Sequence, residues 1–519
     1  MVSTSLFWRS YIMSEALKSN TLNAVRTVRL PEKQFTAEHT FRTEEGSTIT
    51  RILAAAADSA VTSVETLKDE ARHGGKTEFT LIYADEEGKV CRLTAAADFS
   101  DKFESPLIRA GAPVHIDAEV QDVTASDQSG QSVTLTAVVG VWALVSAETE
   151  TAVLRPAEDL IVKNAAANVC TVSARLSRTI TVEDEFEIKG QATEVHYAGA
   201  RAEIHSRISG SGAVTLDGNL HVTFTYTDTE KGGTQSVLQS LPFSYEFDAA
   251  GCNFADSVFA SVKVAQTRAL VAVDEERDES TVSIAADICV FIECYRCEEA
   301  QLPVDAFSPT HKLRTESAAQ PVTRYAGCVR TVEKIEGNLR LDDDMAEVYR
   351  ILAVCRSGSI VTGVSKSDGR YFAEGIITGN VLYEDTEGQK YAVSAEVPFS
   401  VPVETNVEDA LIIACSTVTE IYARCRNGRD IDIFATVVIQ ADIFENDTIS
   451  CLTQAEVTEP RSEEYPLSIY FAQRGESRFE ACKHLCCTEA ELARQNDSAP
   501  DVFEKEERLV LYRSALTEK

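Results

Sequence analysis

Cysteine and histidine side chains that could bind a metal or react with oxidants gather in two short runs. The runs are Cys289, Cys294 and Cys297, within an apolar stretch, and Cys482, His484, Cys486 and Cys487, near the C-terminus. A structural zinc site usually takes two closely spaced pairs of ligands, and neither run is followed by a second pair at a recognisable spacing. We therefore expect no metal site and no cofactor. The cysteines are interpreted as core, linker or local packing residues; the alternatives are a metal site at the first run and metal binding or redox sensitivity of the second run.

Catalytic chemistry has little support in the residue patterns. The eight histidines form no His-Glu-x-x-His motif, and no Gly-x-Ser-x-Gly, phosphate-loop or Gly-x-Gly-x-x-Gly motif occurs. With 82 acidic residues in the chain, neighbouring carboxylates are common and identify no acid–base site. The sequence predicts that the protein is not an enzyme. A hydrolase with unrecognised catalytic residues is the remote alternative.

The balance of charge limits the class of partner. Lysine and arginine number 49 against 82 aspartates and glutamates, which gives a net charge of −33. Nucleic acid and anionic lipid both attract clustered cations, so neither is an expected partner. No run reaches the roughly 18 apolar residues of a membrane helix, and we expect Val133–Ala147 to be a buried strand.

The chain has fourteen cysteines and no recognisable export signal. We therefore predict that the thiols are reduced and that the protein is cytoplasmic. Met13 begins a more ordinary cytosolic start than Met1 does, so we leave open which of the two is the first residue.

A sparse pattern of glycine, tyrosine, aspartate and phenylalanine recurs three times. In each copy tyrosine follows glycine by eight residues, aspartate follows by two more, and a Phe-Ser pair ends the pattern. The copies are Gly75, Tyr83, Asp85 and Phe99; Gly218, Tyr226, Asp228 and Phe243; and Gly375, Tyr383, Asp385 and Phe399. A strand-like run precedes each aspartate, and a turn closed by Gly88, Gly232 or Gly388 follows it. We interpret these residues as hairpin, core and turn formers and not as a ligand site.

This repeat predicts a mainly β protein with three tandem β-rich repeat domains and a small β-α-α-β module. The tyrosines lie 143 and 157 residues apart, which is enough for each copy to hold its own core. The expected parts are an N-terminal extension (1–30), a divergent first domain (31–150), a second domain (166–297), a third domain (317–447), an acidic linker (448–466) and the terminal module (467–513). Residues 151–165 and 298–315 are predicted linkers. The stretch Leu53–Arg72 could equally be helical.

The tail changes from strand-like runs to a mixed pattern. Ser477 is a candidate helix cap, and Thr488 and Glu491 have the spacing of a capping box. The expected order is a strand at Tyr470, a turn at Gly475, two helices of which the second ends near Asn496, and a closing strand over Arg508–Tyr512. A unit of this size is small for independent stability.

This tail resembles the LysM family. Tyr470, Gly475, Leu492 and Asn496 stand at positions that match the family's pattern, whereas Arg478 replaces its usual leucine. LysM modules bind polymers of N-acetylglucosamine between the first strand–helix loop and the exit of the second helix. The resemblance implies a groove for protein or glycan binding formed by Gly475, Glu476, Ser477, Arg478, Phe479 and Asn496.

The three repeats resemble the SPOCS domain, which has a Gly-led strand, a tyrosine before an acidic turn and a Pro-Phe-Ser strand. The first copy has Asp98 in place of the proline. Tandem SPOCS domains with a terminal LysM module are similar to proteins of the clostridial spore envelope. The resemblance implies a non-catalytic scaffold in coat or cortex assembly, located in the mother cell at the outer surface of the forespore. Its implied partner is the coat-basement morphogenetic ATPase (SpoIVA-like). The alternative is a peptidoglycan-binding protein that acts through the LysM-like module.

Overall fold

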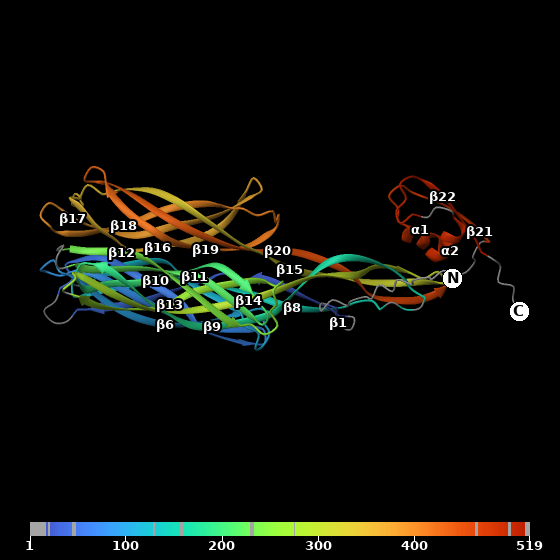
Figure 1. The fold of residues 1–519 in the computed structure, drawn as a ribbon, viewed down its shortest axis with the longest axis horizontal. Coiled ribbons are helices and arrows are strands. Elements are labelled where there is room, and N and C mark those ends of the chain that lie inside the picture. Colours follow the sequence, from blue (N-terminus) through green and yellow to red (C-terminus); the bar gives the residue numbers. More distant parts are fainter. Residues whose placement is uncertain are drawn as a thin grey trace.

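The computed structural model is elongated and consists almost entirely of β-strands (Figure 1). It describes residues 17–18, 21–43, 48–127, 130–155, 157, 159–228, 233–274, 276–461, 466–496 and 500–513. Within these ranges there are 22 strands and two short helices. The prediction of a mainly β protein with a small helical part at the C-terminal end is confirmed.

Three successive parts of the chain fold into the same six-stranded sandwich, and we call them modules 1, 2 and 3. The strands of module 1 are β3 (Lys33–Arg42), β4 (Arg51–Leu67), β5 (Glu70–Ala84), β6 (Val90–Glu104), β7 (His115–Asp127) and β8 (Ser132–Ala152). Those of module 2 are β9 (Ile161–Lys189), β10 (Ala192–Ser209), β11 (Ala213–Asp228), β12 (Gly233–Asp248), β13 (Ser257–Asp274) and β14 (Glu279–Phe307). Those of module 3 are β15 (His311–Arg340), β16 (Arg350–Ser367), β17 (Arg370–Glu384), β18 (Lys390–Val403), β19 (Ala410–Cys425) and β20 (Asp430–Pro460).

Each module contains two antiparallel sheets with one strand order, and each of these sheets has three strands except one sheet of module 1, which has five. The second, third and fourth strands form a meander, as in β10–β11–β12. The last strand lies between the fifth and the first, as in β13–β14–β9. Alternate residues of these strands face inward, so the two sheets enclose a core. In β8, for example, Val133, Leu135, Ala137 and Val139 are fully buried, which confirms the predicted buried strand.

The recurring glycine and phenylalanine face each other across two strands of the meander. Gly75 pairs with Phe99, Gly218 with Phe243, and Gly375 with Phe399. A Cβ atom on any of these glycines would overlap the phenylalanine ring and a carbonyl oxygen of the preceding strand. The ring therefore packs on bare backbone, which explains why glycine and phenylalanine recur together. Tyr83, Tyr226 and Tyr383 are buried in the three module cores.

The recurring aspartate shapes the turn that follows it. Asp85 Oδ1 accepts hydrogen bonds from the backbone N–H groups of Glu87 and Lys89, at 3.0 and 2.8 Å. Asp385 Oδ1 accepts the same pair of bonds from Glu387 and Gln389, both at 2.9 Å. The predicted turn role is confirmed for these two residues. Asp228 is buried at the end of β11, and Gly232 in the turn beyond it lies outside the described residues.

The first and last strands of the modules run past the sandwiches and meet in a shared core. In module 1 the first strand is divided into β2 (Thr21–Arg29) and β3, which both pair with β8. Pro31 lies at the break, where its missing N–H and fixed φ interrupt the ladder. A further short strand, β1 (Leu17–Lys18), pairs with β2. The shared core draws on all three modules and includes Leu22, Phe259, Phe291, Tyr295, Tyr325 and Phe444.

Polar side chains are also buried between the modules. Glu293 of module 2 accepts hydrogen bonds from Arg175 at 2.6 Å, from Ser146 of module 1 at 2.7 Å, and from Tyr295 at 2.6 Å. Arg207 of module 2 lies 3.5 Å from Asp442 of module 3. A buried carboxylate is tolerated when it is paired and hydrogen-bonded in this way. The three modules therefore form one body.

Several predicted linkers are strands instead. Residues 298–307 of the predicted linker 298–315 continue β14, and residues 448–460 of the predicted acidic linker 448–466 continue β20. The interpretation of residues 298–307 and 448–460 as linkers is therefore wrong. Their charged and proline residues fit long two-stranded ribbons, which expose both edges and one face to water. Part of the predicted N-terminal extension is β2, and Leu53–Arg72 is β4 with the start of β5, so its helical alternative is also wrong.

The terminal module has the predicted β-α-α-β order. It contains β21 (Leu467–Ala472), α1 (Arg478–Leu485), α2 (Glu489–Gln495) and β22 (Glu507–Tyr512). Ser477 caps α1 and Thr488 caps α2, each within a complete capping box, which confirms both predicted caps. Neither helix in the described part of the chain is long and apolar enough to cross a bilayer. Figure 1 shows this module beyond the ends of the long strands, away from the sandwiches.

Candidate functional site

The terminal module is held on the end of the β9–β14 ribbon by its first helix. Phe479 of α1 packs edge-on against Phe307, the last residue of β14, with ring centroids 5.2 Å apart. Both rings are buried, and both belong to the core of the terminal module. Lys483 pairs with Asp305 at 2.6 Å, and Lys163 lies 3.5 Å from Glu480. Helix α1 thus faces the ribbon, so Phe479 is a junction residue and not part of an open groove.

The polar residues of the predicted groove are engaged within the module. Tyr470 donates a hydrogen bond to Glu476 Oε1 at 2.6 Å, and the backbone N–H of Gln473 donates to Glu476 Oε2 at 2.8 Å. Burial, together with that bond to Glu476, raises the pKa of the Tyr470 hydroxyl to about 12. Arg478 pairs with Asp501 at 2.6 Å. Each of these side chains therefore stabilises the local fold.

Asn496 connects the second helix to the closing strand. Its Nδ2 donates to the carbonyl oxygens of Leu492 and Val510, at 2.9 and 3.0 Å, and its Oδ1 accepts from the N–H of Val510 at 2.9 Å. The amide is thus used on both sides by the backbone. Asn496 lies where the sequence places it, at the exit of α2, but its hydrogen-bonding groups are directed inward.

The two loops of the predicted groove are joined by backbone hydrogen bonds. Gly475 N–H donates to the carbonyl of Phe503 at 2.8 Å, and Phe503 N–H donates to the carbonyl of Glu476 at 2.9 Å. Gly475 has φ +87°, a conformation that suits glycine at this turn. Gly475, Glu476 and Ser477 lie on the loop that leads into α1, and Arg478 is the first residue of that helix. The structure uses these residues mainly to close that loop against the chain that follows α2.

A different surface of the module is open. The sheet formed by β21 and β22 has α1 and α2 on one face, where Ala472, Leu509 and Leu511 are buried. On its other face Leu467 is 45% exposed, Ile469 54%, Phe471 52% and Tyr512 65%. Leu467 pairs with Tyr512, and Ile469 pairs with the half-buried Val510. We call these five residues the terminal apolar face.

Neither a protein-family model, nor a curated protein, nor a solved structure matches this chain. The resemblance to the SPOCS and LysM families therefore stays a prediction.

The terminal apolar face is not among the predicted sites, although the sequence contains a signal for it. In the stretch Leu-Ser-Ile-Tyr-Phe-Ala, apolar side chains stand at alternate positions 467, 469 and 471. That alternation places all three on one face of a strand. Because the buried face also holds Tyr470 and Ala472, the sequence alone does not tell which side contacts the helices.

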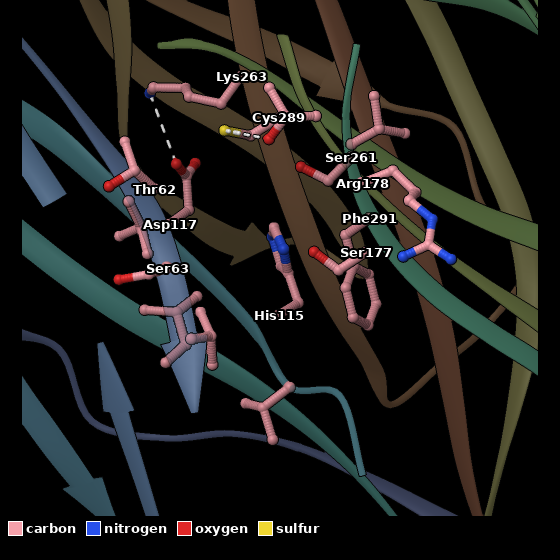
Figure 2. Close-up of a pocket in the computed structure, with 16 residues that line it drawn as sticks. Thr62, Ser63, His115, Asp117, Ser177, Arg178, Ser261, Lys263, Cys289 and Phe291 are labelled. Atoms are coloured by element: carbon pink, nitrogen blue, oxygen red, sulfur yellow. Dashed lines mark hydrogen bonds and ion pairs between the residues drawn. The ribbon is translucent and has the colours of Figure 1, made fainter. Parts of the chain in front are cut away.

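A small polar cavity lies between modules 1 and 2 (Figure 2). Its volume is about 70 Å³, and His115 of β7 lines it beside Asp117 and Lys263, which are 3.7 Å apart. The His115 ring is buried against Trp142 and Phe291, and its Nε2 has no hydrogen-bond partner in the described part of the chain. Burial lowers the pKa of His115 to about 4, so the imidazole is neutral near pH 7. We interpret the cavity as part of the packing between the modules.

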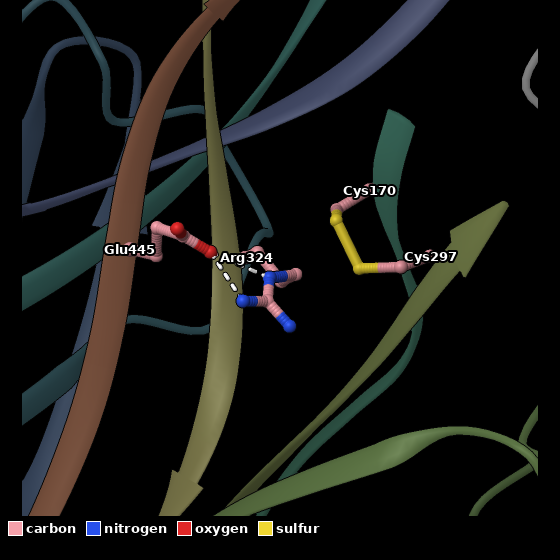
Figure 3. Close-up of a disulfide and its surroundings, with 4 residues drawn as sticks. All are labelled: Cys170, Cys297, Arg324 and Glu445. Atoms are coloured by element: carbon pink, nitrogen blue, oxygen red, sulfur yellow. Dashed lines mark hydrogen bonds and ion pairs between the residues drawn. A yellow bond between two sulfur atoms is a disulfide. The ribbon is translucent and has the colours of Figure 1, made fainter. Parts of the chain in front are cut away.

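One pair of cysteines differs from the prediction of reduced thiols. Cys170 of β9 and Cys297 of β14 form a disulfide (Figure 3). The two residues lie opposite each other in the ladder, although 127 positions separate them in the sequence. The prediction is therefore wrong for this pair, because spacing within the run at Cys289 cannot reveal a partner in another strand. The remaining twelve cysteines are free.

The second cysteine run packs inside the terminal module. Cys482 and Cys487 are buried there, whereas Cys486 is partly exposed at the end of α1. Among the described side chains, no group of three or more His, Cys, Asp or Glu could hold a metal ion.

Proposed function

We propose that the protein is a non-catalytic scaffold in endospore envelope assembly, and that the terminal module docks it to a coat morphogenetic protein. The terminal apolar face is the observation that carries the proposal. Its side chains are about half exposed on a module held away from the main body. Exposed apolar side chains that gather on one face in this way commonly mark a protein-binding site.

The partner that the resemblance implies is the coat-basement ATPase (SpoIVA-like). The organisation also resembles that of the spore morphogenesis protein SipL. In this proposal the protein acts in the mother cell at the outer surface of the forespore. The three modules give the scaffold its rigid body, because their shared core, the Ser146–Glu293 hydrogen bond and the buried Arg207–Asp442 ion pair resist separation.

Peptidoglycan binding through the same module is the competing proposal. One observation favours it: Phe471 and Tyr512 are exposed aromatic rings, and such rings present broad apolar faces to a ligand. The internal engagement of Glu476, Arg478 and Asn496 weighs against a glycan in the predicted groove. We therefore place docking to a protein first.

Binding of the full chain to the purified ATPase tests the proposal. Ile469→Lys puts a charge in the centre of the terminal apolar face, and we expect it to weaken binding at least about tenfold, because burying an unpaired charge costs more than 1.4 kcal/mol. Leu270→Lys is the matched control, since Leu270 is 76% exposed on module 2. Retention of the wild-type chain on purified peptidoglycan, without affinity for the ATPase, would overturn the proposal.

A further inference from the structure

Module 2 carries a chain of three side chains with the arrangement of a base-activated serine. Ser240 Oγ lies 3.2 Å from His221 Nδ1, and His221 Nε2 lies 2.9 Å from Glu203 Oε2. Ser240 and His221 stand directly opposite each other on β12 and β11, and Glu203 reaches the ring from β10. A serine, a histidine and a carboxylate linked in this order form the unit that activates a hydroxyl for attack on a carbonyl carbon.

The carboxylate fixes the proton on the histidine ring. Burial by itself raises the pKa of Glu203, but hydrogen bonds from His221 and from Arg330 of module 3 outweigh it and leave the pKa lowered. The Arg330 bond is 2.6 Å long. An ionised Glu203 can only accept, so the neutral ring carries its hydrogen on Nε2. Nδ1 then presents a lone pair to Ser240, as a general base requires.

The serine is accessible while its two supports are not. Ser240 is exposed on β12, which pairs only with β11 among the described strands. His221 and Glu203 are buried, at 5% and 1% exposure. A buried carboxylate and imidazole hold their geometry without competition from water, and an exposed hydroxyl can meet a reagent.

The sandwich does not need this arrangement. The positions of His221 and Ser240 are occupied by Glu78 and Ala96 in module 1, and by Thr378 and Glu396 in module 3, each in the same cross-strand register. All three modules keep the same strand order. Packing within the sandwich therefore does not explain the serine and histidine in module 2.

We propose that Ser240 is a modification site that accepts an acyl group from an acyl thioester. As Ser240 Oγ attacks the thioester carbonyl carbon, its proton passes to His221 Nδ1. The Oγ–C bond forms, the C–S bond breaks, and the proton then passes to the departing sulfur, which leaves as a thiol. The product is an ester on Ser240. The reaction is stoichiometric, so it goes beyond the docking role without making the scaffold an enzyme.

Labelling of the full-length protein tests this proposal. The chain is treated with a fluorophosphonate and, separately, with S-phenyl thioacetate, and the adducts are located by peptide mass spectrometry. Ser244 is the internal control, because it is exposed on the same strand and donates to Asp217 at 2.6 Å instead of contacting a histidine. We expect Ser240 to react with both reagents about 10² to 10⁴ times faster than Ser244, the usual gain from a positioned base.

Two variants complete the test. Ser240→Ala should remove the adduct without affecting folding, because the side chain is exposed. Glu203→Gln should slow labelling at Ser240 at least about tenfold, since the amide no longer fixes the tautomer of His221. Equal rates at Ser240 and Ser244 in the wild-type chain would overturn the proposal, whatever the variants do. Labelling by the fluorophosphonate but not by the thioester would exclude acyl transfer.

Discussion

Replacing Phe307 with alanine should release the terminal module from the main body. Phe307 is only 2% exposed and contacts the ring of Phe479 across the junction. Truncation of a buried phenylalanine costs about 3–5 kcal/mol. The other contacts include Ile161, which packs against the core of the terminal module, and the pairs Lys483–Asp305 and Lys163–Glu480, whose side chains are 35–44% exposed. Such exposed pairs contribute up to about 1 kcal/mol each, so the ring contact dominates the junction.

The expected loss of contact free energy should weaken the equilibrium between the docked and the released terminal module by a factor of about 10² or more. Hydrogen exchange of the full chain measures it. Amides at the end of the ribbon, around residues 161–163 and 305–307, pair in the ladder beneath the module. They should exchange faster in Phe307→Ala, while amides in the sandwiches keep their protection.

Phe471→Ala is the control, because Phe471 belongs to the same module but lies half exposed on the opposite side of the sheet. It should leave exchange at the ribbon end unchanged. Unaltered exchange there in Phe307→Ala would refute the reasoning, because it would show that the aromatic contact does not hold the module in place.

Three further outcomes follow from the packing. Gly218→Ala should destabilise module 2 by about 1–3 kcal/mol, measured by urea unfolding, because the new methyl group overlaps the Phe243 ring. The control is Gly233→Ala, where an added Cβ atom would meet no atom within 4 Å, and we expect it to have little effect. The free energy of unfolding should fall by about 2–3 kcal/mol at most as the pH drops from about 6.5 toward about 4. The reason is that burial lowers the pKa of His115 to about 4, while the same histidine in the unfolded chain protonates near pH 6.5. His115→Gln should flatten this pH dependence, and an unchanged slope in the variant would contradict the role of His115. Cys297→Ser should lower the midpoint of thermal unfolding under non-reducing conditions, since the disulfide closes a loop of 127 residues. The control Cys289→Ser replaces a free thiol and should leave the midpoint unchanged. Equal midpoints for the two variants would count against a stabilising disulfide.

The repeated pattern contained most of the information about the modules. Gly218 and Phe243 recur because a ring packs on bare backbone, and Asp85 recurs because its carboxylate organises a turn. Such local requirements keep residue type and spacing constant, so they can be read from the sequence. The caps Ser477 and Thr488 were predictable for the same reason.

The association of the modules could not be predicted in this way. Glu293 and Arg175 are charged residues, a type that is usually exposed to solvent, yet they meet Ser146 of another module in a buried network. The pairing of Cys170 with Cys297 likewise depends on two strands far apart in the chain. In the candidate site, the sequence placed Glu476 and Asn496 on the expected loops but could not show that the module's own backbone engages them.

The most direct test of the scaffold proposal is the position of a fluorescent fusion of the full chain in sporulating cells. A protein that docks the coat basement should form a ring around the forespore, and Ile469→Lys should become diffuse at equal abundance while Leu270→Lys keeps the ring. A wild-type signal that stays diffuse throughout sporulation, or a ring that Ile469→Lys leaves intact, would contradict docking through the terminal apolar face.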